Sequence, residues 1–265
     1  MKNNINIRFL AFIAILVSFS SCQKVISIDL NSSDPRYIVE GNITDQPGPY
    51  HVKITKSVNF DQSNVFPAVT GASVIITDTV AGVIDTLTES AAGDYTTSKL
   101  QGTPGHFYTL TIKSNNKVIT SYGLMPQPIS LDSMYAEPSP FGGDPVVVPV
   151  FTDPETQGNY YQFIDYRNDT PNTEIFILDD KFVNGQTNRQ PLQGRGGDDG
   201  KLKPGDHVRV DLLCIDSAVY KYYATLDQLT NSNSATPANP LSNFTGGALG
   251  YFSVHTVSTK SLIIR

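Results

Sequence analysis

The fold is decided by the stretch LQGTPGHFYTLTI, which runs from Leu100 to Ile112. Its first half is rich in glycine and proline, the residues that favour tight turns. In its second half, Tyr108, Leu110 and Ile112 alternate with polar threonines, and this period-two pattern is typical of a strand with one buried face. The stretch therefore predicts a turn that leads directly into a half-buried β-strand.

The same alternation continues on both sides of this stretch. Gly, Pro or Asn separates nearly every pair of strand-like runs, so each run is short. Seven short strands with turns every 8 to 12 residues describe an immunoglobulin-like β-sandwich, which we place at residues 37–124. The predicted strands are Tyr37–Ile43, Tyr50–Val58, Ala72–Val80, Val83–Glu89, Asp94–Ser98, His106–Lys113 and Lys117–Tyr122.

Tyr108 lies near the start of the sixth predicted strand. This position resembles the tyrosine corner of fibronectin type III and related domains, in which the hydroxyl bonds back to the upstream backbone. We therefore expect Tyr108 to have a structural role. His51 and His106 lie in the same region, but neither has a second imidazole or a carboxylate at the spacing of a zinc site, so we assign them no metal.

The pattern changes near Leu124. Five prolines between Gly123 and Pro145 interrupt the alternation, and further strand-like runs follow. We interpret residues 125–265 as a second antiparallel β domain. Its predicted strands are Val146–Phe151, Tyr160–Arg167, Glu174–Lys181, Val208–Ile215, Tyr251–Val257 and Ser261–Ile264.

One segment of this second domain follows a helical period instead. Apolar residues recur there at the spacing of one helix face, after Asp216 or Ser217 as an N-cap. The segment predicts one amphipathic helix at residues 216–230, and we expect its tyrosines to pack against the sheet. The residues of this face are Val219, Tyr222, Tyr223, Leu226 and Leu229.

The N-terminal end carries the zones of a secretory signal. Residues 1–8 are basic, Phe9 to Phe19 form an apolar run of 11 residues, and small residues precede Cys22. A membrane-spanning helix needs about 20 residues, so this run is too short to remain as a transmembrane anchor. We interpret residues 1–21 as a cleaved signal peptide and residues 22–36 as a polar tether.

A cysteine directly after two small residues is also the pattern of a bacterial lipobox, in which the cysteine is acylated and becomes the mature N-terminus. Phe19 departs from this pattern, since a branched aliphatic residue usually stands three places before the cysteine. We predict lipid attachment at Cys22, and two or three acyl chains would make a stable anchor. A second interpretation stays open, in which an ordinary signal is cut nearby and Cys22 remains a thiol.

The composition excludes several classes of function. Without Lys2 and Arg8 of the leader, 17 basic residues stand against 25 acidic ones, a net charge of −8, and no basic cluster favours nucleic acid as a partner. Cys214 is the only cysteine besides Cys22, so an acylated chain has no intramolecular disulfide. Because no catalytic or cofactor-binding motif occurs, we predict a protein that is not an enzyme and has no catalytic residue, cofactor or metal.

A long glycine-rich segment runs from Val183 to Gly205. It holds Arg195, Asp198 and Asp199, and its pattern matches neither a phosphate-binding loop nor an EF-hand. We expect the segment to be too rich in glycine to pack. It is either an interaction loop that orders on contact or a loop without a role.

Several segments together resemble a known family. They are Ile26–Asp29, Tyr37–Asp45, Tyr50–Lys56, Gly71–Ile76, Gly93–Tyr95 and Leu241–Phe252. Their order is similar to that of the domain-of-unknown-function 4249 family of Bacteroidota lipoproteins, over nearly the whole mature chain. The resemblance implies a lipid-anchored protein of the cell outer membrane that works alongside TonB-dependent transporters. It supplies no catalytic residue.

Two functions from different classes remain. In the first, the protein is a non-enzymatic accessory subunit that captures a small molecule, peptide or glycan for a TonB-dependent transporter. In the second, it is a structural or envelope-assembly lipoprotein without a small-molecule ligand. We expect the first, with the partner contacting the second domain at its 183–205 loop.

Overall fold

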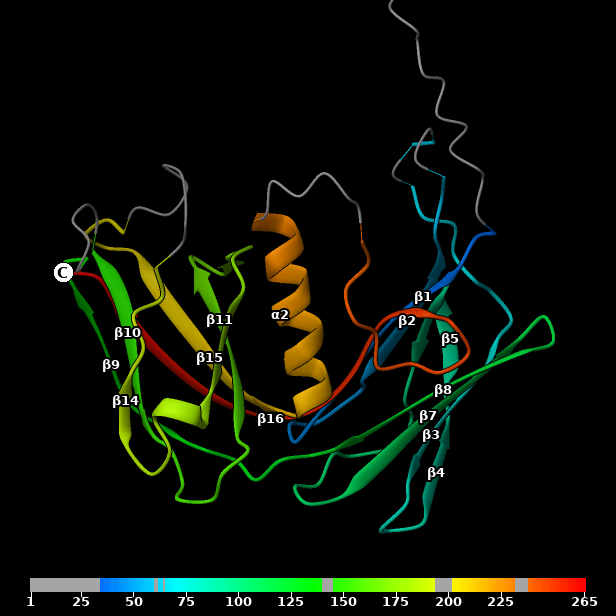
Figure 1. The fold of residues 1–265 in the computed structure, drawn as a ribbon, viewed down its shortest axis with the longest axis horizontal. Coiled ribbons are helices and arrows are strands. Elements are labelled where there is room, and N and C mark those ends of the chain that lie inside the picture. The colour runs from blue at the N-terminus through cyan, green and yellow to red at the C-terminus, as the bar shows by residue number, and fades with distance from the viewer. Residues whose placement is uncertain (1–33, 60–61, 64, 140–144, 194–201, 232–237) are drawn as a thin grey trace, which may run out of the picture. The chain divides into compact units, whose positions relative to one another are not determined.

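The first half of the chain is built from short strands (Figure 1). The computed structural model describes residues 34–59, 62–63, 65–139, 145–193, 202–231 and 238–265. Within these residues the strands of the first half are β1 (Tyr37–Thr44), β2 (His51–Lys56), β3 (Ser73–Asp78), β4 (Val83–Thr86), β5 (Thr88–Ala91), β6 (Asp94–Thr96), β7 (Phe107–Ser114) and β8 (Lys117–Leu124).

These strands form a β-sandwich of the immunoglobulin and fibronectin type III kind, as predicted. One sheet contains the order β1-β2-β6-β5 and the other has the order β4-β3-β7-β8, which corresponds to strands ABED and C′CFG of an immunoglobulin-type domain. The predicted run Val83–Glu89 is wrong as a single strand. The chain leaves the second sheet after Thr86 and joins the first at Thr88, and Leu87 between them is buried in the core.

The core of this sandwich lies between the two sheets. Alternate residues of each strand point inward, as the period-two pattern requires. Val52 and Ile54 of β2 face Leu110 and Ile112 of β7, and all four side chains have 0% exposure. Lys53 and Thr111, which lie between these pairs, face outward, which explains why the alternation was visible in the sequence.

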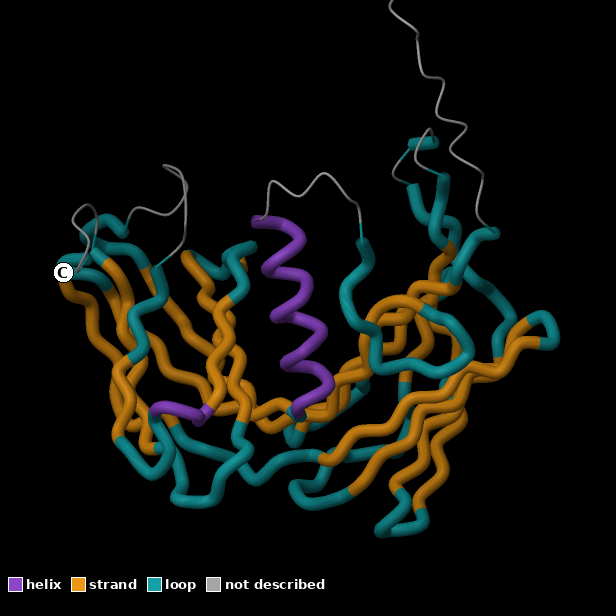
Figure 2. Tube along the Cα trace, viewed as in Figure 1, coloured by secondary structure: helices purple, strands orange, loops and turns teal. Residues whose placement is uncertain are grey.

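The second half contains the remaining strands, one α-helix and one short 3-10 helix (Figure 2). Within the described residues these are β9 (Leu131–Glu137), β10 (Val146–Thr152), β11 (Tyr160–Arg167), β12 (Thr170–Pro171), β13 (Phe176–Asp179), η1 (Asp180–Phe182), β14 (Thr187–Arg189), β15 (His207–Ile215), α2 (Ser217–Asn231) and β16 (Leu249–Ile263). Strands β14-β10-β9 form one sheet, which packs against β11, β15 and β16 through a second core that includes Phe151, Phe163 and Leu212.

Strand β16 belongs to both halves. Its residues Leu249 to His255 pair in parallel with β1, and its residues Thr256 to Ile263 pair antiparallel with β15. The prediction of two separate strands here is wrong, because one continuous strand of 15 residues runs through both pairings. Residues Pro35–Arg265 form one compact unit, and the domain division that we predict near Leu124 stays a prediction.

The parallel pairing of β16 with β1 requires glycine at position 250. Gly250 has a φ of 92°, and a Cβ atom there would lie 2.0 Å from the carbonyl oxygen of Val39. No side chain fits this approach, and a positive φ of this kind strains every residue except glycine. Gly250 therefore allows β16 to pair closely with β1.

The predicted amphipathic helix is confirmed and spans Ser217–Asn231. It lies against β16, where the rings of Tyr222 and Tyr251 are 4.9 Å apart and those of Tyr223 and Tyr251 are 5.4 Å apart. Val219 is fully buried beneath the first turn. The aromatic stripe of the helix is therefore packing surface, as the helical spacing predicts.

Candidate functional site

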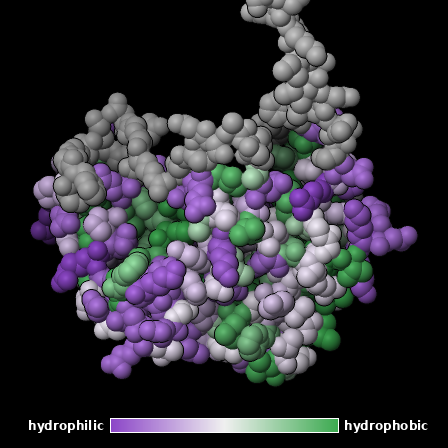
Figure 3. Space-filling view, in the orientation of Figure 1, coloured by the Kyte–Doolittle hydropathy of each residue, from purple (hydrophilic) through white to green (hydrophobic). Residues whose placement is uncertain are grey.

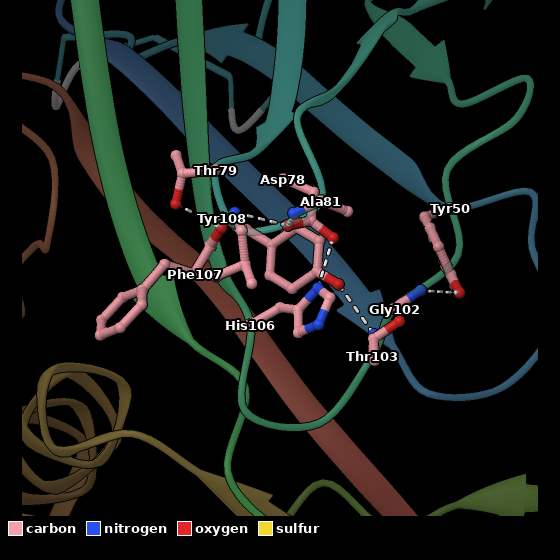
Figure 4. A network of polar contacts seen from close by, with 10 residues as sticks. Tyr50, Asp78, Thr79, Ala81, Gly102, Thr103, His106, Phe107 and Tyr108 are labelled. Atoms are coloured by element: carbon pink, nitrogen blue, oxygen red, sulfur yellow. Dashed lines mark hydrogen bonds and ion pairs between the residues drawn. The ribbon is translucent and has the colours of Figure 1, made fainter.

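A network of polar contacts fixes the turn before β7 (Figure 4). The hydroxyl of the fully buried Tyr108 accepts a hydrogen bond of 2.7 Å from the amide of Thr103, five residues upstream, which is the geometry of a tyrosine corner. The amide of the next residue back, Gly102, donates to the hydroxyl of Tyr50 at 3.0 Å. These two bonds tie the turn to the core of the sandwich.

Asp78 holds the other side of the same turn. Its carboxylate accepts hydrogen bonds from the amides of Val80 and Ala81, at 3.0 and 2.9 Å, and lies 2.8 Å from Nδ1 of His106. Burial alone would raise the pKa of Asp78, but the bonds from Ala81, His106 and Val80 outweigh it and lower the pKa. His106 is thus a partner of Asp78.

The network positions Phe107 on the outer face of the sheet. Figure 4 shows its ring pointing away from the polar contacts, whereas Tyr108 points into them. Phe107 pairs with Leu124 on β8, and Tyr122 lies two residues along the same face. These three side chains are 49%, 39% and 74% exposed. Figure 3 shows apolar surface low in the view, where Figure 1 places the start of β7.

A groove of about 760 Å³ opens beside these three residues. Ligand sites are typically concave, mostly apolar and between about 300 and 1,000 Å³, with a few polar groups that fix orientation. The groove has this character. Its lining includes Phe107, Tyr122 and Leu124 of β7 and β8, Pro126 and Ile129 after β8, Asn159 and Tyr160 at β11, and Asp216 at the start of α2.

Asp216 is the one lining residue of the groove, among the described residues, that carries a formal charge. Its Oδ1 accepts hydrogen bonds of 2.9 and 2.8 Å from the amides of Ala218 and Val219, so it caps the helix as the sequence predicts. Burial raises the pKa of this carboxyl, although the two amide bonds act in the opposite direction.

Gly123 lets β8 lie close to β16 and to the start of α2. A Cβ atom at this position would lie 2.9 Å from Cγ2 of Val254 and 3.2 Å from Oδ2 of Asp216. Any side chain here would press on Val254 in the middle of β16 and on the carboxylate. The glycine therefore lets the edge of β8 approach the charged end of the groove.

Among the site residues predicted from the sequence, Tyr108 is described by the structure and does not line the groove. Cys22 and the interaction residues Arg195, Asp198 and Asp199 lie outside the described residues. Tyr108 lies beneath the groove. The groove itself was missed, and its one signal in the sequence is that Phe107, Tyr122 and Leu124 occupy outward positions where the same strands otherwise carry mainly threonine and other polar residues.

The expectation that the 183–205 segment is too rich in glycine to pack is wrong for its two ends. Thr187–Arg189 form β14, which pairs with β10. Leu192 is 1% exposed and its amide donates to the carbonyl of Val147 at 2.9 Å, while Leu202 is 6% exposed. Buried leucines at both ends outweigh the low packing value of glycine.

Histidines and carboxylates outside the groove are of the residue types that bind metal ions. Nδ1 of the exposed His51 lies 3.0 Å from the Asp94 carboxylate. Within the described part of the chain, no group of three or more His, Cys, Asp or Glu side chains is arranged to hold a metal ion. Among these same residues, no helix is long and apolar enough to span a membrane.

The arrangement described so far is that of a β-sandwich protein with an apolar groove at Phe107, Tyr122 and Leu124. The chain belongs to the family described as "Domain of unknown function (DUF4249)", whose model matches residues 23–261. This confirms the family resemblance seen in the sequence. No curated protein matches the chain.

Three solved structures are similar to this chain over much of its length. A two fibronectin type-III domain segment from chicken tenascin is 14% identical, with 69% of this chain and 93% of that chain covered and a TM-score of 0.23. The chicken interferon gamma receptor alpha chain is 8% identical, with 68% of this chain and 89% of that chain covered and a TM-score of 0.23. A cytokine receptor complex is 13% identical, with 86% of this chain and 95% of that chain covered and a TM-score of 0.25.

Proposed function

We propose that this protein is a lipid-anchored, non-enzymatic lipoprotein of the cell outer membrane that captures a ligand for a TonB-dependent transport system. The cysteine pattern at Cys22 supports the anchor, and membership of the family supports the setting. The observation that carries the proposal is the groove beside Phe107 and Tyr122, because it exposes aromatic side chains in a concave site of ligand size.

The place of the groove on the sandwich supports capture. At one end of β1, the hydroxyl of Tyr37 donates to Ser114 in the β7–β8 hairpin. At the other end, the carbonyl of Thr44 lies against Gly102, in the turn that precedes Phe107. Eight residues of strand separate these ends by roughly 25 Å. The predicted tether precedes Tyr37, so it joins the sandwich at the end opposite the groove.

The transporter contact belongs to the same proposal. We assign it to the second half and to the 183–205 segment, with Arg195, Asp198 and Asp199 as interaction residues. Arginine forms charge-assisted bonds to carboxylates, which suits it to a protein contact. The alternative is a structural lipoprotein of the envelope, whose outer surfaces only bridge other proteins. A ligand separates the two, since a bridging protein needs none.

Ligand capture is tested by thermal unfolding of the chain from Gln23 onward in the presence of metabolite, peptide and glycan libraries. A compound that binds only the folded form raises the unfolding temperature. We expect at least one compound to do so with the wild type and not with Tyr122→Ala. Ile84→Ala is the matched control, because Ile84 is 56% exposed on the same sandwich but does not line the groove. The absence of any stabilising compound would favour the envelope-assembly function.

The anchor is tested separately by membrane fractionation of the full-length chain. Cys22→Ser removes the acylated sulfur, so we expect the variant to leave the membrane fraction after a high-salt wash. Cys214→Ser is the matched control, because Cys214 is buried in the second core. Sedimentation of Cys22→Ser with membranes would contradict lipid attachment.

A further inference from the structure

We propose that the groove selects a small apolar ligand with a single cationic amino group, which binds between the aromatic side chains and the carboxylate of Asp216. This inference rests on the proposed function, because it names the class of ligand that the same groove would capture. It goes further in assigning the charge and polarity of that ligand.

One carboxylate oxygen of Asp216 takes no part in the helix cap. Oδ1 accepts both amide bonds of the helix cap, from Ala218 and Val219. Oδ2 lies beside Gly123, and no described residue donates a hydrogen bond to it. The cap therefore uses one oxygen of a carboxylate that lines the groove, and no described residue bonds to the other.

Capping of α2 does not require a charged residue. Asparagine and serine cap a helix about as well as aspartate, because each offers one acceptor oxygen. Burial raises the pKa of the Asp216 carboxyl, which shows that the site disfavours an isolated negative charge. A buried charge is normally offset by an opposite charge or by further donors. A bound cation would supply both.

Aromatic side chains line the groove together with Asp216. Phe107 and Tyr122 present aromatic rings, and Tyr160 lines the side near α2. Aromatic faces attract ammonium groups and also pack against apolar bodies. Among the described lining residues there is no Lys, Arg or His, so an anionic ligand would face Asp216 without a compensating charge.

Three indole probes of nearly the same shape test the proposal. Tryptamine carries an ammonium group, tryptophol carries a hydroxyl in its place, and indole-3-acetate carries a carboxylate. The chain has no Trp, so the fluorescence anisotropy of each indole reports binding directly at neutral pH when excited where tyrosine does not absorb. We expect the Kd of tryptamine to be about tenfold lower than that of tryptophol, which corresponds to one favourable charge contact, and indole-3-acetate to bind most weakly.

The decisive variant is Asp216→Asn, which keeps the capping oxygen and removes the charge. We expect its unfolding temperature to stay close to that of the wild type, and its tryptamine Kd to rise to the level of tryptophol. Asp169→Asn is the matched control, because it makes the same charge change outside the groove and should leave the tryptamine Kd unchanged. Tyr122→Ala should weaken the binding of both tryptamine and tryptophol.

Several results would overturn the inference. These are equal affinity for tryptamine and tryptophol, tighter binding of indole-3-acetate, no binding of any probe, or an unchanged tryptamine Kd in Asp216→Asn. The proposed function fails on a different result, which is the absence of any stabilising compound in the libraries. If a library compound stabilises the wild type but not Tyr122→Ala while tryptamine shows no preference, the groove is a capture site for a different class of ligand.

Discussion

The side chain of Asn243 bonds to both backbone groups of Phe252. Its Nδ2 donates to the carbonyl oxygen of Phe252 at 2.8 Å, and its Oδ1 accepts from the amide of Phe252 at 2.9 Å. A neighbouring strand would offer the same donor and acceptor. Phe252 lies on β16, which at this point pairs with a strand on one side only, so the amide of Asn243 takes the place of a second strand.

Replacing Asn243 should therefore destabilise the first sandwich. Asn243→Ala leaves the amide and carbonyl of the fully buried Phe252 without partners, and we expect a loss of about 2–4 kcal/mol in the free energy of unfolding. Asn243→Asp should also destabilise, because a carboxylate cannot donate to the carbonyl. Chemical denaturation measures both. Gln228→Ala, on the exposed side of α2, should change stability little, and an Asn243→Ala variant as stable as this control would contradict the assignment.

The tyrosine corner makes a second prediction. Tyr108→Phe removes the acceptor of the Thr103 amide and leaves a part-buried donor unpaired. We expect a loss of about 1–2 kcal/mol in the free energy of unfolding. Tyr122→Phe removes a hydroxyl from a ring that is 74% exposed, so it should have no measurable effect on the same denaturation curve. Equal effects of the two changes would show that the corner does not stabilise the turn.

The sequence predicts the strands of the first sandwich well because each has one buried and one solvent face. β7 shows this directly, since Tyr108, Leu110 and Ile112 are buried and Thr109 and Thr111 between them are not. The alternation of apolar and polar residues does not mark the limits of a strand that changes partners along its length. Ser258 to Lys260 are polar because they lie beyond the buried part of β16, and this interruption suggested two strands although the pairing with β15 continues through it.

The sequence also does not predict β9 or the groove, because both depend on packing between distant segments of the chain. β9 was missed because only Leu131 of its seven residues is buried, which removes the alternation. The groove was missed because exposed apolar residues carry no period of their own. Phe107, Leu124 and Asp216 are separated by up to 109 positions in the sequence, and only the pairing of β7 with β8 and the path of β16 bring them together.

The packed end of the 183–205 segment gives a third prediction. Leu192→Ala opens a cavity beside Val147 in the second core, and large-to-small changes of this kind cost about 2–4 kcal/mol in the free energy of unfolding. Leu241→Ala makes the same change at a side chain that is 59% exposed, so its effect should be small. Urea denaturation compares the two. If Leu192→Ala unfolds at the same urea concentration as the control, then residues 190–193 do not contribute to the core.

The last prediction concerns His255, which lies on β16 with 6% exposure. Burial lowers its pKa from 6.5 to about 4, and Nδ1 lies 2.9 Å from the hydroxyl of Ser253. Below pH 6.5 the unfolded chain therefore binds a proton that the folded chain does not. The contribution of this neutral histidine to stability is fully present above pH 6.5, falls between pH 6.5 and 4, and amounts to roughly 3 kcal/mol in all.

This pH dependence is measured by urea denaturation at several pH values between 4 and 7. His255→Asn keeps an acceptor near Ser253 but does not titrate, so the difference in stability between wild type and variant should shrink steadily as the pH falls through this window. His51→Asn is the matched control, because it makes the same substitution at a side chain that is 58% exposed. A difference between wild type and His255→Asn that stays constant from pH 7 to pH 4 would show that His255 is protonated in the folded protein as readily as in the unfolded chain.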